Sequence, residues 1–282
     1  MFYVRHGSEN FTVIDCRLTE GDTMEPIIEE IRRESRDKNV VRFISTHPDD
    51  DHIKGIVELD DAMGFLNFYC VKNEATKPDG TDAFDHYCSL RDSDKAYYLR
   101  RGCRRKWMNV TDEQHGSAGI EFLWPVTENQ EYRTALDLAA SGGRANNISP
   151  IFTYSLNQGA RMMWMGDLET KFMESIENAI GDFPQVDVLF APHHGRDTPP
   201  TTWMDQIDPQ IVVLGEAEEE HLDPYTGFTK MRQSRSGDLT FECDGSKIHI
   251  YATNASYSNR AIQNQRQPDR YGNYVGTIDA HG

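Results

Sequence analysis

Long uninterrupted apolar runs are missing from this sequence. No stretch of its 282 residues approaches the roughly 20 consecutive apolar residues that span a bilayer. The first ten residues carry Arg5, His6 and Glu9 and lack the apolar segment of a secretory signal peptide. The sequence therefore predicts a cytoplasmic protein that does not associate with membranes.

Cysteine is scarce. The chain has five cysteines, an odd number, and no two of them stand at the CxxC spacing of thiolate metal sites. We therefore expect reduced thiols, as in other cytoplasmic proteins, and no thiolate zinc knuckle.

Positive charge is also in short supply. Lys and Arg number 29 against 46 Asp and Glu, a formal net charge of −17. Such a balance argues against indiscriminate binding to nucleic acid or anionic membranes. One basic cluster, residues 99–107, stands out and includes Arg104 and Arg105. It has two interpretations, a solvated helix face or a substrate-binding rim for phosphates with Trp107 stacking on a base.

Short β-rich runs alternate with amphipathic segments, which is typical of α/β proteins. Helices are expected at residues 23–36, from about 53, and at 170–180, and a closing hairpin turns at Asp244-Gly245. The expected strands cover residues 11–15, 40–44, 120–124, part of 146–156, 161–165, 186–190, 211–214, 239–243 and 247–251.

Two regions do not fit this alternation. Residues from about 72 to 116 are polar with few periodic apolar positions, and we interpret them as an insertion or lid. Residues 256–282 form a polar C-terminal tail without an obvious core. The predicted organisation is one hydrolase-sized domain, 1–255, followed by this tail, and either polar region could contact a protein partner.

Several predicted strands end in a short loop that holds His or Asp. Strand-end loops are where α/β folds place functional sites, and imidazole and carboxylate are ligands preferred by zinc and similar ions. The residues concerned are His47, Asp49, Asp51, His52, Asp167, His193, His194 and His221.

The spacing suggests two metal ions. His47 and Asp49 alternate, so both can face one ion, while Asp51 and His52 can serve a second. Asp167 arrives alone from another strand, and a lone carboxylate can bridge two cations. A pair of ions about 3.5–4 Å apart generates a hydroxide nucleophile near neutral pH.

These motifs resemble the metallo-β-lactamase superfamily. The segment 46–55, THPDDDHIKG, is similar to its HxHxDH signature, and Gly166-Asp167 is similar to its bridging-aspartate motif. The segments 146–149, 192–195, 221–224 and 235–241 resemble the branch that contains the hydrolase domain of the DNA-uptake protein ComEC and bacterial phosphorylcholine esterases. The resemblance covers roughly residues 1–252 and implies a four-layer αββα sandwich.

The resemblance also implies the ligands. Metal A would be bound by His47, Asp49, Asp167 and His193, and metal B by Asp51, His52, Asp167 and His221. Asp49 replaces the second His of the general signature, as it does in the phosphorylcholine-esterase-like branch. The added carboxylate makes the site harder, so two zinc ions are expected with manganese as a competitor.

Further roles are assigned around the metals. Asp51, Asp167 and His194 are the predicted catalytic residues, and Asn147 joins the two arginines as a predicted substrate-binding residue. His193 is preferred to His194 as the metal ligand, while His194 could instead donate to the leaving group or to a phosphate oxygen. Asp15 is a predicted acceptor that orients a ligating imidazole.

Each motif also has a purely structural interpretation. Residues 47–52 could be an acidic turn that caps a helix, Asp167 a turn aspartate, and His221 part of a solvated acidic loop that starts at Glu216. The start Arg5-His6-Gly7 resembles the RHG signature of histidine phosphatases, but no other part of the chain supports that reading.

The sequence thus predicts a dinuclear metal-dependent hydrolase, and the resemblance makes it a phosphodiesterase or nuclease that acts on a nucleic acid or nucleotide. A hydrolase of a small phosphorylated compound, a cyclic nucleotide or a carboxylic ester is one alternative. A metal-stabilised interaction module of a multi-protein, defence-type assembly is another. A nuclease should lose substrate binding steeply with salt, whereas a small-molecule hydrolase should not.

Overall fold

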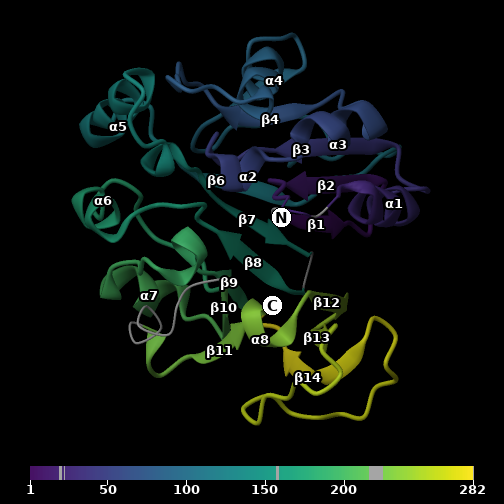
Figure 1. The fold of residues 1–282 in the computed structure, drawn as a ribbon. Coiled ribbons are helices and arrows are strands. Elements are labelled where there is room, and N and C mark those ends of the chain that lie inside the picture. Colours follow the sequence, from purple (N-terminus) through teal and green to yellow (C-terminus); the bar gives the residue numbers. More distant parts are fainter. Residues whose placement is uncertain (19–20, 22, 157–158, 216–224, 282) are drawn as a thin grey trace. The chain divides into compact units, whose positions relative to one another are not determined.

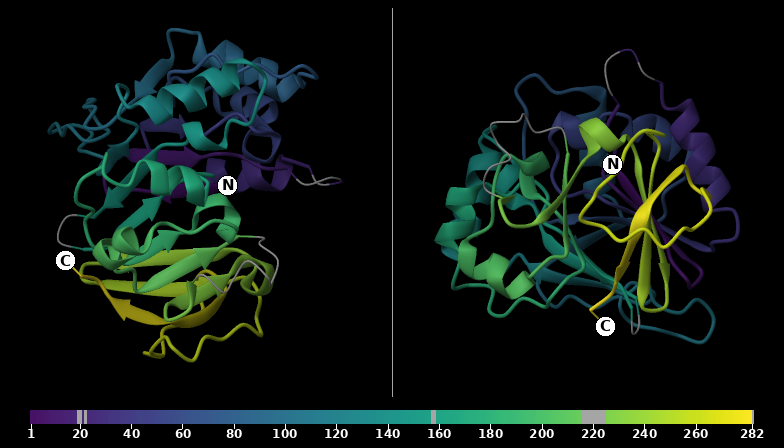
Figure 2. Two further views of the ribbon diagram at one scale, coloured as in Figure 1. Left: turned by 90° about the vertical axis from the view of Figure 1, so that its left-hand side faces the viewer. Right: turned by 90° about the horizontal axis from the view of Figure 1, so that it is seen from below.

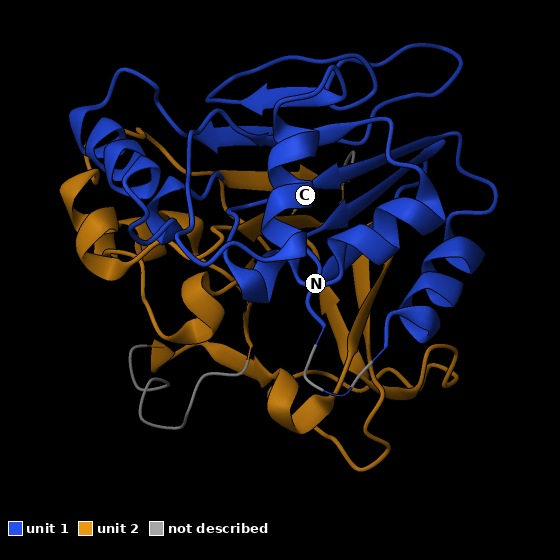
Figure 3. Cartoon of the chain, turned by 45° about the horizontal axis from the view of Figure 1, so that its top comes forward, with its two compact units in different colours: residues 1–150 blue, residues 151–282 orange. Residues whose placement is uncertain are grey.

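The computed structural model describes residues 1–18, 21, 23–156, 159–215 and 225–281. The chain is an α/β protein with two mixed sheets and a small antiparallel sheet (Figure 1). It divides into two compact units, residues 1–150 and 151–282, coloured separately in Figure 3. Each unit is described by itself below.

Unit 1 contains a five-stranded sheet in the order β1-β2-β3-β4-β5. Only β1 runs antiparallel to its neighbour. Because the other strands are parallel, their carboxyl ends share one edge, where Ile14 of β2 pairs with Ile44 of β3. The strands are β1 (Phe2–Arg5), β2 (Asn10–Ile14), β3 (Val40–Ile44), β4 (Phe68–Val71) and β5 (Ala96–Leu99).

Aromatic side chains fill one face of this sheet. Phe43 stacks on Phe68 at 5.8 Å and meets Phe65 at 5.0 Å. Tyr87 of α4 lies edge-on to Phe68, which fastens that helix to β4. Burial of such large apolar side chains supplies the main stabilisation of the sheet. The helices of unit 1 are α1 (Glu25–Glu34), α2 (Asp50–Ile53), α3 (Ile56–Met63), α4 (Asp82–Arg91), α5 (Gln130–Ala140) and the short η1 (Asn146–Ile148).

The segment 72–116, predicted as an insertion or lid, contains regular structure. It holds α4, which is capped by Thr81, and β5, which adds to the sheet beside β4. Its apolar positions are few because only one side of each element faces the core. The boundary at residue 255 stays a prediction.

The second sheet has six strands in the order β11-β10-β9-β8-β7-β6. Strands β7 and β8 pair antiparallel, whereas β8, β9, β10 and β11 are all parallel. Phe152, Trp164 and Phe190 form a continuous aromatic stack across three of the strands. The strands are β6 (Ile120–Trp124), β7 (Ile151–Ser155), β8 (Arg161–Trp164), β9 (Val188–Phe190), β10 (Ile211–Leu214) and β11 (Thr229–Arg232). The helices are α6 (Thr170–Ser175), η2 (Pro192–Gly195), α7 (Thr201–Ile207) and α8 (Gln233–Ser236).

The third sheet is antiparallel and consists of β12 (Leu239–Asp244), β13 (Lys247–Ala252) and β14 (Asn273–Asp279), drawn in green to yellow in Figure 2. The predicted hairpin around Asp244-Gly245 is confirmed. The expectation that residues 256–282 lack a core is wrong for β14, where Tyr274 and Val275 are buried. The polar character of the flanking residues hid this one strand.

The five cysteines are unpaired, as predicted. Burial raises the pKa of Cys70 and of Cys243 to about 12. Among the residues that the structure describes, no helix combines the length and the apolarity that crossing a bilayer requires.

Candidate metal centre

Asp15 organises the first loop of the candidate site. It follows β2 with a φ of 53°, a conformation that aspartate tolerates better than most residues. Its Oδ1 accepts the backbone N–H of Thr46 at 2.8 Å, and its Oδ2 accepts the Thr46 hydroxyl at 2.7 Å. The same Oδ2 lies 2.8 Å from Nδ1 of His52, so Asp15 fixes the ring and leaves Nε2 to face outward. The predicted contact between Asp15 and an imidazole is present, and the role of that imidazole as a metal ligand stays a prediction.

His47 is fixed in a similar way. Its Nδ1 lies 3.1 Å from the Thr46 hydroxyl and 3.3 Å from the Ser149 hydroxyl. Its Nε2 lies 3.7 Å from Oδ2 of Asp49, and the ring is buried. His47 and His52 are packed together with ring centroids 4.1 Å apart. The parallel strands β2 and β3 thus bring Asp15 and the loop 46–52 to one edge of the unit 1 sheet.

In unit 2 the corresponding residues follow β8 and β9. Gly166 turns the chain with a φ of 53°, and the buried Asp167 comes next. His193 and His194 both have positive φ values, 50° and 59°, and the His193 N–H donates to the Gly166 carbonyl at 3.0 Å. Such left-handed conformations are costly for non-glycine residues and concentrate at functional sites.

Asp197 holds His193. The Nδ1 of His193 lies 2.6 Å from Oδ2 of Asp197, and Oδ1 of the same carboxylate accepts the N–H of Thr170 at 2.7 Å. The hydrogen bond to Asp197 raises the pKa of His193 against the opposite effect of burial. Burial acts to raise the pKa of Asp197, but its hydrogen bonds with His193 and Thr170 outweigh this effect and lower it.

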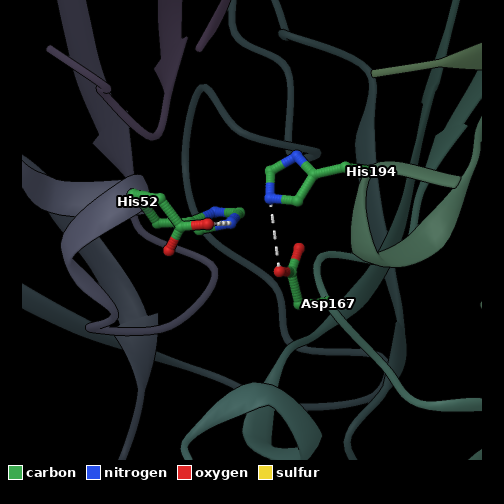
Figure 4. Close-up of side chains that lie close together, drawn as sticks. His52, Asp167 and His194 are labelled. Carbon is green, nitrogen blue, oxygen red and sulfur yellow. Dashed lines mark ion pairs between the residues drawn. The ribbon is translucent and has the colours of Figure 1, made fainter. Parts of the chain in front are cut away.

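Four residues form a cluster able to hold a metal ion. One ligand atom from each of Asp51, His52, Asp167 and His194 lies within 4.8 Å of the others. His52 and Asp167 are buried, His194 is half-buried, and Asp51 is exposed. Nε2 of His194 lies 3.5 Å from Oδ2 of Asp167, the ion pair drawn as a dashed line in Figure 4. Nε2 of His193 lies 3.9 Å from the same oxygen.

The donor set suits a divalent cation. Three imidazoles share one arrangement, those of His47, His52 and His193. Nδ1 faces a hydroxyl in His47 and a carboxylate in the other two. Nε2 of each ring lies within 4 Å of another carboxylate, that of Asp49, Asp51 or Asp167 respectively. A histidine held on one nitrogen by a carboxylate and left open on the other is the usual arrangement around zinc. The residues therefore fit a metal site of mixed imidazole and carboxylate ligands.

Not every predicted ligand belongs to the cluster. His47, Asp49 and His193 are not among its four members, and His194 is, although His193 is the predicted ligand. His221 lies outside the described residues. The assignment of individual ligands to metal A and metal B stays a prediction.

The predicted substrate-binding residues Arg104, Arg105 and Asn147 all belong to unit 1, and their role in substrate binding stays a prediction. Arg105 is half-buried between Tyr69 and Tyr97, with its guanidinium 5.1 Å and 4.6 Å from the ring centres, and Nη2 donates to Asn67. Arg104 is exposed, and Asn147 is half-buried in η1. Trp107 donates its indole N–H to Asp112 at 2.7 Å. For Arg105 and Trp107 these contacts supply a packing role within unit 1.

Sequence reasoning missed three residues that position the site. Asp197 stands four residues after His193, a spacing that could have suggested an acceptor for a ligand histidine. Thr46 and Ser149 lie in the segments 46–55 and 146–149 that carry the resemblance, but no role was predicted for their hydroxyl groups. The histidine of the RHG-like start, His6, is buried and bonded to the Thr12 hydroxyl at 2.8 Å, in keeping with its structural interpretation.

No protein-family model matches this chain, and no curated protein matches it either.

Proposed function

We propose that this protein is a metal-dependent hydrolase of the metallo-β-lactamase fold, most suited to phosphodiester bonds. The observation that carries the proposal is the cluster of Asp51, His52, Asp167 and His194, together with the carboxylates that hold the neighbouring imidazoles. A structural metal site is closed by its protein ligands, whereas a catalytic site keeps an open position. The exposure of Asp51 leaves such an opening on one side.

In this proposal the site is dinuclear. Asp167 would bind both metals, His47 and Asp49 would bind one of them, and Asp51 and His52 would bind the other. His193, His194 and His221 share the remaining positions, and the preference for His193 in the first ligand shell is retained. Zinc is the preferred metal because imidazoles outnumber carboxylates in this set, and manganese is the competitor because three carboxylates are present.

The described residues have distinct tasks. Divalent ions bound here would acidify a water molecule and neutralise the oxygens of a phosphate group. Asp15 and Asp197 keep Nδ1 of His52 and of His193 protonated, so that Nε2 of each ring is presented as the ligand atom. His194 lies 3.5 Å from Asp167; where it does not bind a metal, it would donate a proton to the leaving oxygen.

The deciding experiment measures metal content and activity on the same samples. Wild type, Asp167→Asn and the control Asp238→Asn are purified with zinc or manganese supplied and analysed by elemental mass spectrometry. Hydrolysis of bis-p-nitrophenyl phosphate and of an oligonucleotide is then followed. We expect about two metals per wild-type chain, and loss of metal and of at least 100-fold in rate in Asp167→Asn only.

A metal-free wild-type chain would refute the proposal. Full metal content without hydrolysis of either substrate would instead favour the alternative of a metal-stabilised interaction module. Hydrolysis of the small ester but not of the oligonucleotide would favour a small phosphorylated or cyclic-nucleotide substrate.

A further inference from the structure

A lysine lies beside the first loop of the candidate metal centre. The ammonium of Lys77 is 3.8 Å from Oδ1 of Asp49 and 3.1 Å from Oδ1 of Asp50. The other oxygen of Asp49, Oδ2, is 3.7 Å from Nε2 of His47. The Asp49 carboxylate thus lies between a candidate ligand nitrogen and a positive charge. All four residues belong to unit 1.

The backbone that leads to Lys77 is fixed from two sides. Thr76 donates its N–H to the carbonyl of Ala139, in the last turn of α5, at 3.1 Å. Asn73 donates its side-chain amide to the hydroxyl of Tyr87 on α4 at 2.8 Å. The lysine therefore starts from a fixed point beside the loop, and its flexible four-carbon stem sets how far the ammonium can move.

The ammonium can leave Asp50 at small cost. Asp50 is exposed and Lys77 is half-buried, so water screens their ion pair, and such pairs contribute little to stability. Asp50 also has a second partner, because the Thr81 hydroxyl donates to the same Oδ1 at 3.3 Å. Nζ of Lys77 lies 5.6 Å from the ring centre of Phe84, which keeps the stem on this side of α4. Another anion near Asp49 could thus take the place of Asp50.

The charge of the proposed site gives this ammonium a role. Residues 49–51 and Asp167 contribute four carboxylates, a formal charge of −4. Two divalent ions would offset that charge and leave none for an anionic substrate. Lysine is an established partner of phosphate oxygens, which it binds as a point charge. The ammonium of Lys77 supplies the next positive charge beside Asp49.

We propose that Lys77 binds a phosphate oxygen of the substrate next to the metal held by His47 and Asp49, and thereby selects anionic phosphate esters over neutral carboxylic esters. The inference rests on the proposed function and deepens it, because metals alone would admit both kinds of ester. Lys77 changes its partner from Asp50 to the phosphate, and no covalent bond is made or broken in that step. Through this residue the segment 72–116, predicted as an insertion or lid, contributes to the site.

The test compares wild type with three variants, all loaded with zinc. Lys77→Gln removes the ammonium, Asp50→Asn breaks the same ion pair but keeps the ammonium, and Lys72→Gln removes an exposed lysine of the same segment. Metal content is measured by elemental mass spectrometry, and binding of inorganic phosphate by isothermal titration calorimetry. The values of kcat/KM are then measured for the anionic bis-p-nitrophenyl phosphate and the neutral p-nitrophenyl acetate.

We expect every sample to retain about two metals per chain. Lys77→Gln should bind phosphate at least tenfold more weakly than wild type, because a hydrogen bond between two charged groups is lost. Its kcat/KM should fall at least tenfold for the phosphodiester and by no more than about twofold for the neutral ester. Asp50→Asn and Lys72→Gln should bind phosphate at least as tightly as wild type.

Four results would overturn the inference. Weakened phosphate binding in Asp50→Asn, equal to that in Lys77→Gln, would mean that the ion pair acts only by shaping the loop. Loss of metal from Lys77→Gln would make this lysine a support for Asp49 instead of a substrate contact. Equal losses for the two esters would remove the selection by charge, and a wild type that binds no phosphate would leave Lys77 without the proposed ligand.

The two proposals can fail separately. If Lys77→Gln binds phosphate as wild type does and wild type hydrolyses the phosphodiester, the hydrolase stands and Lys77 is not its phosphate contact. If Lys77→Gln alone loses phosphate binding but no sample hydrolyses either ester, Lys77 belongs to an anion site and the hydrolase proposal fails.

Discussion

At the scale of single residues, the carboxylates behind the histidines matter as much as the histidines themselves. Asp15 accepts two N–H or O–H groups from Thr46 and also faces Nδ1 of His52. Asp197 does the same for His193 and Thr170. The candidate ligands could be proposed from the sequence because they follow hydrophobic strands, and their metal binding stays a prediction. Asp15 was readable for the same reason, whereas Asp197 lies in a polar loop whose course only the fold determines.

Asp15→Asn should weaken metal binding. An asparagine can still accept from the Thr46 N–H, but its amide group then faces Nδ1–H of His52, and two donors cannot bond to each other. We expect a 10- to 100-fold loss of zinc affinity, measured by competition with a chromogenic chelator. Asp61→Asn, an exposed substitution on α3, is the control. An unchanged affinity in Asp15→Asn would show that this contact does not orient a ligand.

The His193–Asp197 pair should make the stability of the metal-free protein depend on pH. The raised pKa of His193 gives a contribution that is complete below about pH 6.5 and is lost as pH rises through the folded-state value. The lowered pKa of Asp197 gives a contribution that is present above about pH 4 and is lost as pH falls through its folded-state value. The pair therefore stabilises the fold most at about pH 5 to 6.

Thermal unfolding in EDTA tests this dependence with Asp197→Asn. The difference in Tm between wild type and variant should be largest near pH 5.5 and should shrink towards pH 8. A difference that stays constant over this range would mean that Asp197 acts only by holding Thr170.

At the scale of elements, the strands that could be predicted from the sequence are those rich in apolar residues. Strands β2, β3, β8 and β10 are short runs in which apolar residues predominate, and the structure confirms them. Strand β11, Thr229–Arg232, could not be predicted, because it lies at the edge of its sheet and three of its four residues are polar.

Neighbouring strand ends constrain each other, and Gly215 shows how. A Cβ added there would lie 3.1 Å from Cβ and 3.2 Å from Cα of His194, tighter than normal contact with backbone that has little room to move. Gly215→Ala should displace His194 by a few tenths of an ångström. We expect at least a fivefold loss of hydrolytic rate with little change in Tm, because such sites tolerate only about 0.5 Å of error.

Gly7→Ala is the matched control for this prediction, since a Cβ at Gly7 would meet nothing within 4 Å. A Gly215→Ala variant with the rate of wild type would place His194 outside the catalytic machinery.

At the scale of the whole molecule, the composition argued against some kinds of binding partner but did not predict the division into units. The net charge of −17 argued against indiscriminate binding to polyanions, but a sum over the chain does not reveal how charge is distributed over the surface. The single domain 1–255 expected from the sequence compares with two compact units that divide at residue 150. Strands and helices continue to alternate across residue 150, so sequence alone showed no boundary there.

The buried thiols described with the fold have a practical consequence for labelling. Alkylating reagents attack thiolates, and burial raises the pKa of all five cysteines, those of Cys70 and Cys243 to about 12. At neutral pH the native chain thus presents almost no reactive sulfur to maleimides or iodoacetamide. A single cysteine introduced on an exposed loop would accept a fluorophore selectively, without prior removal of the natural ones.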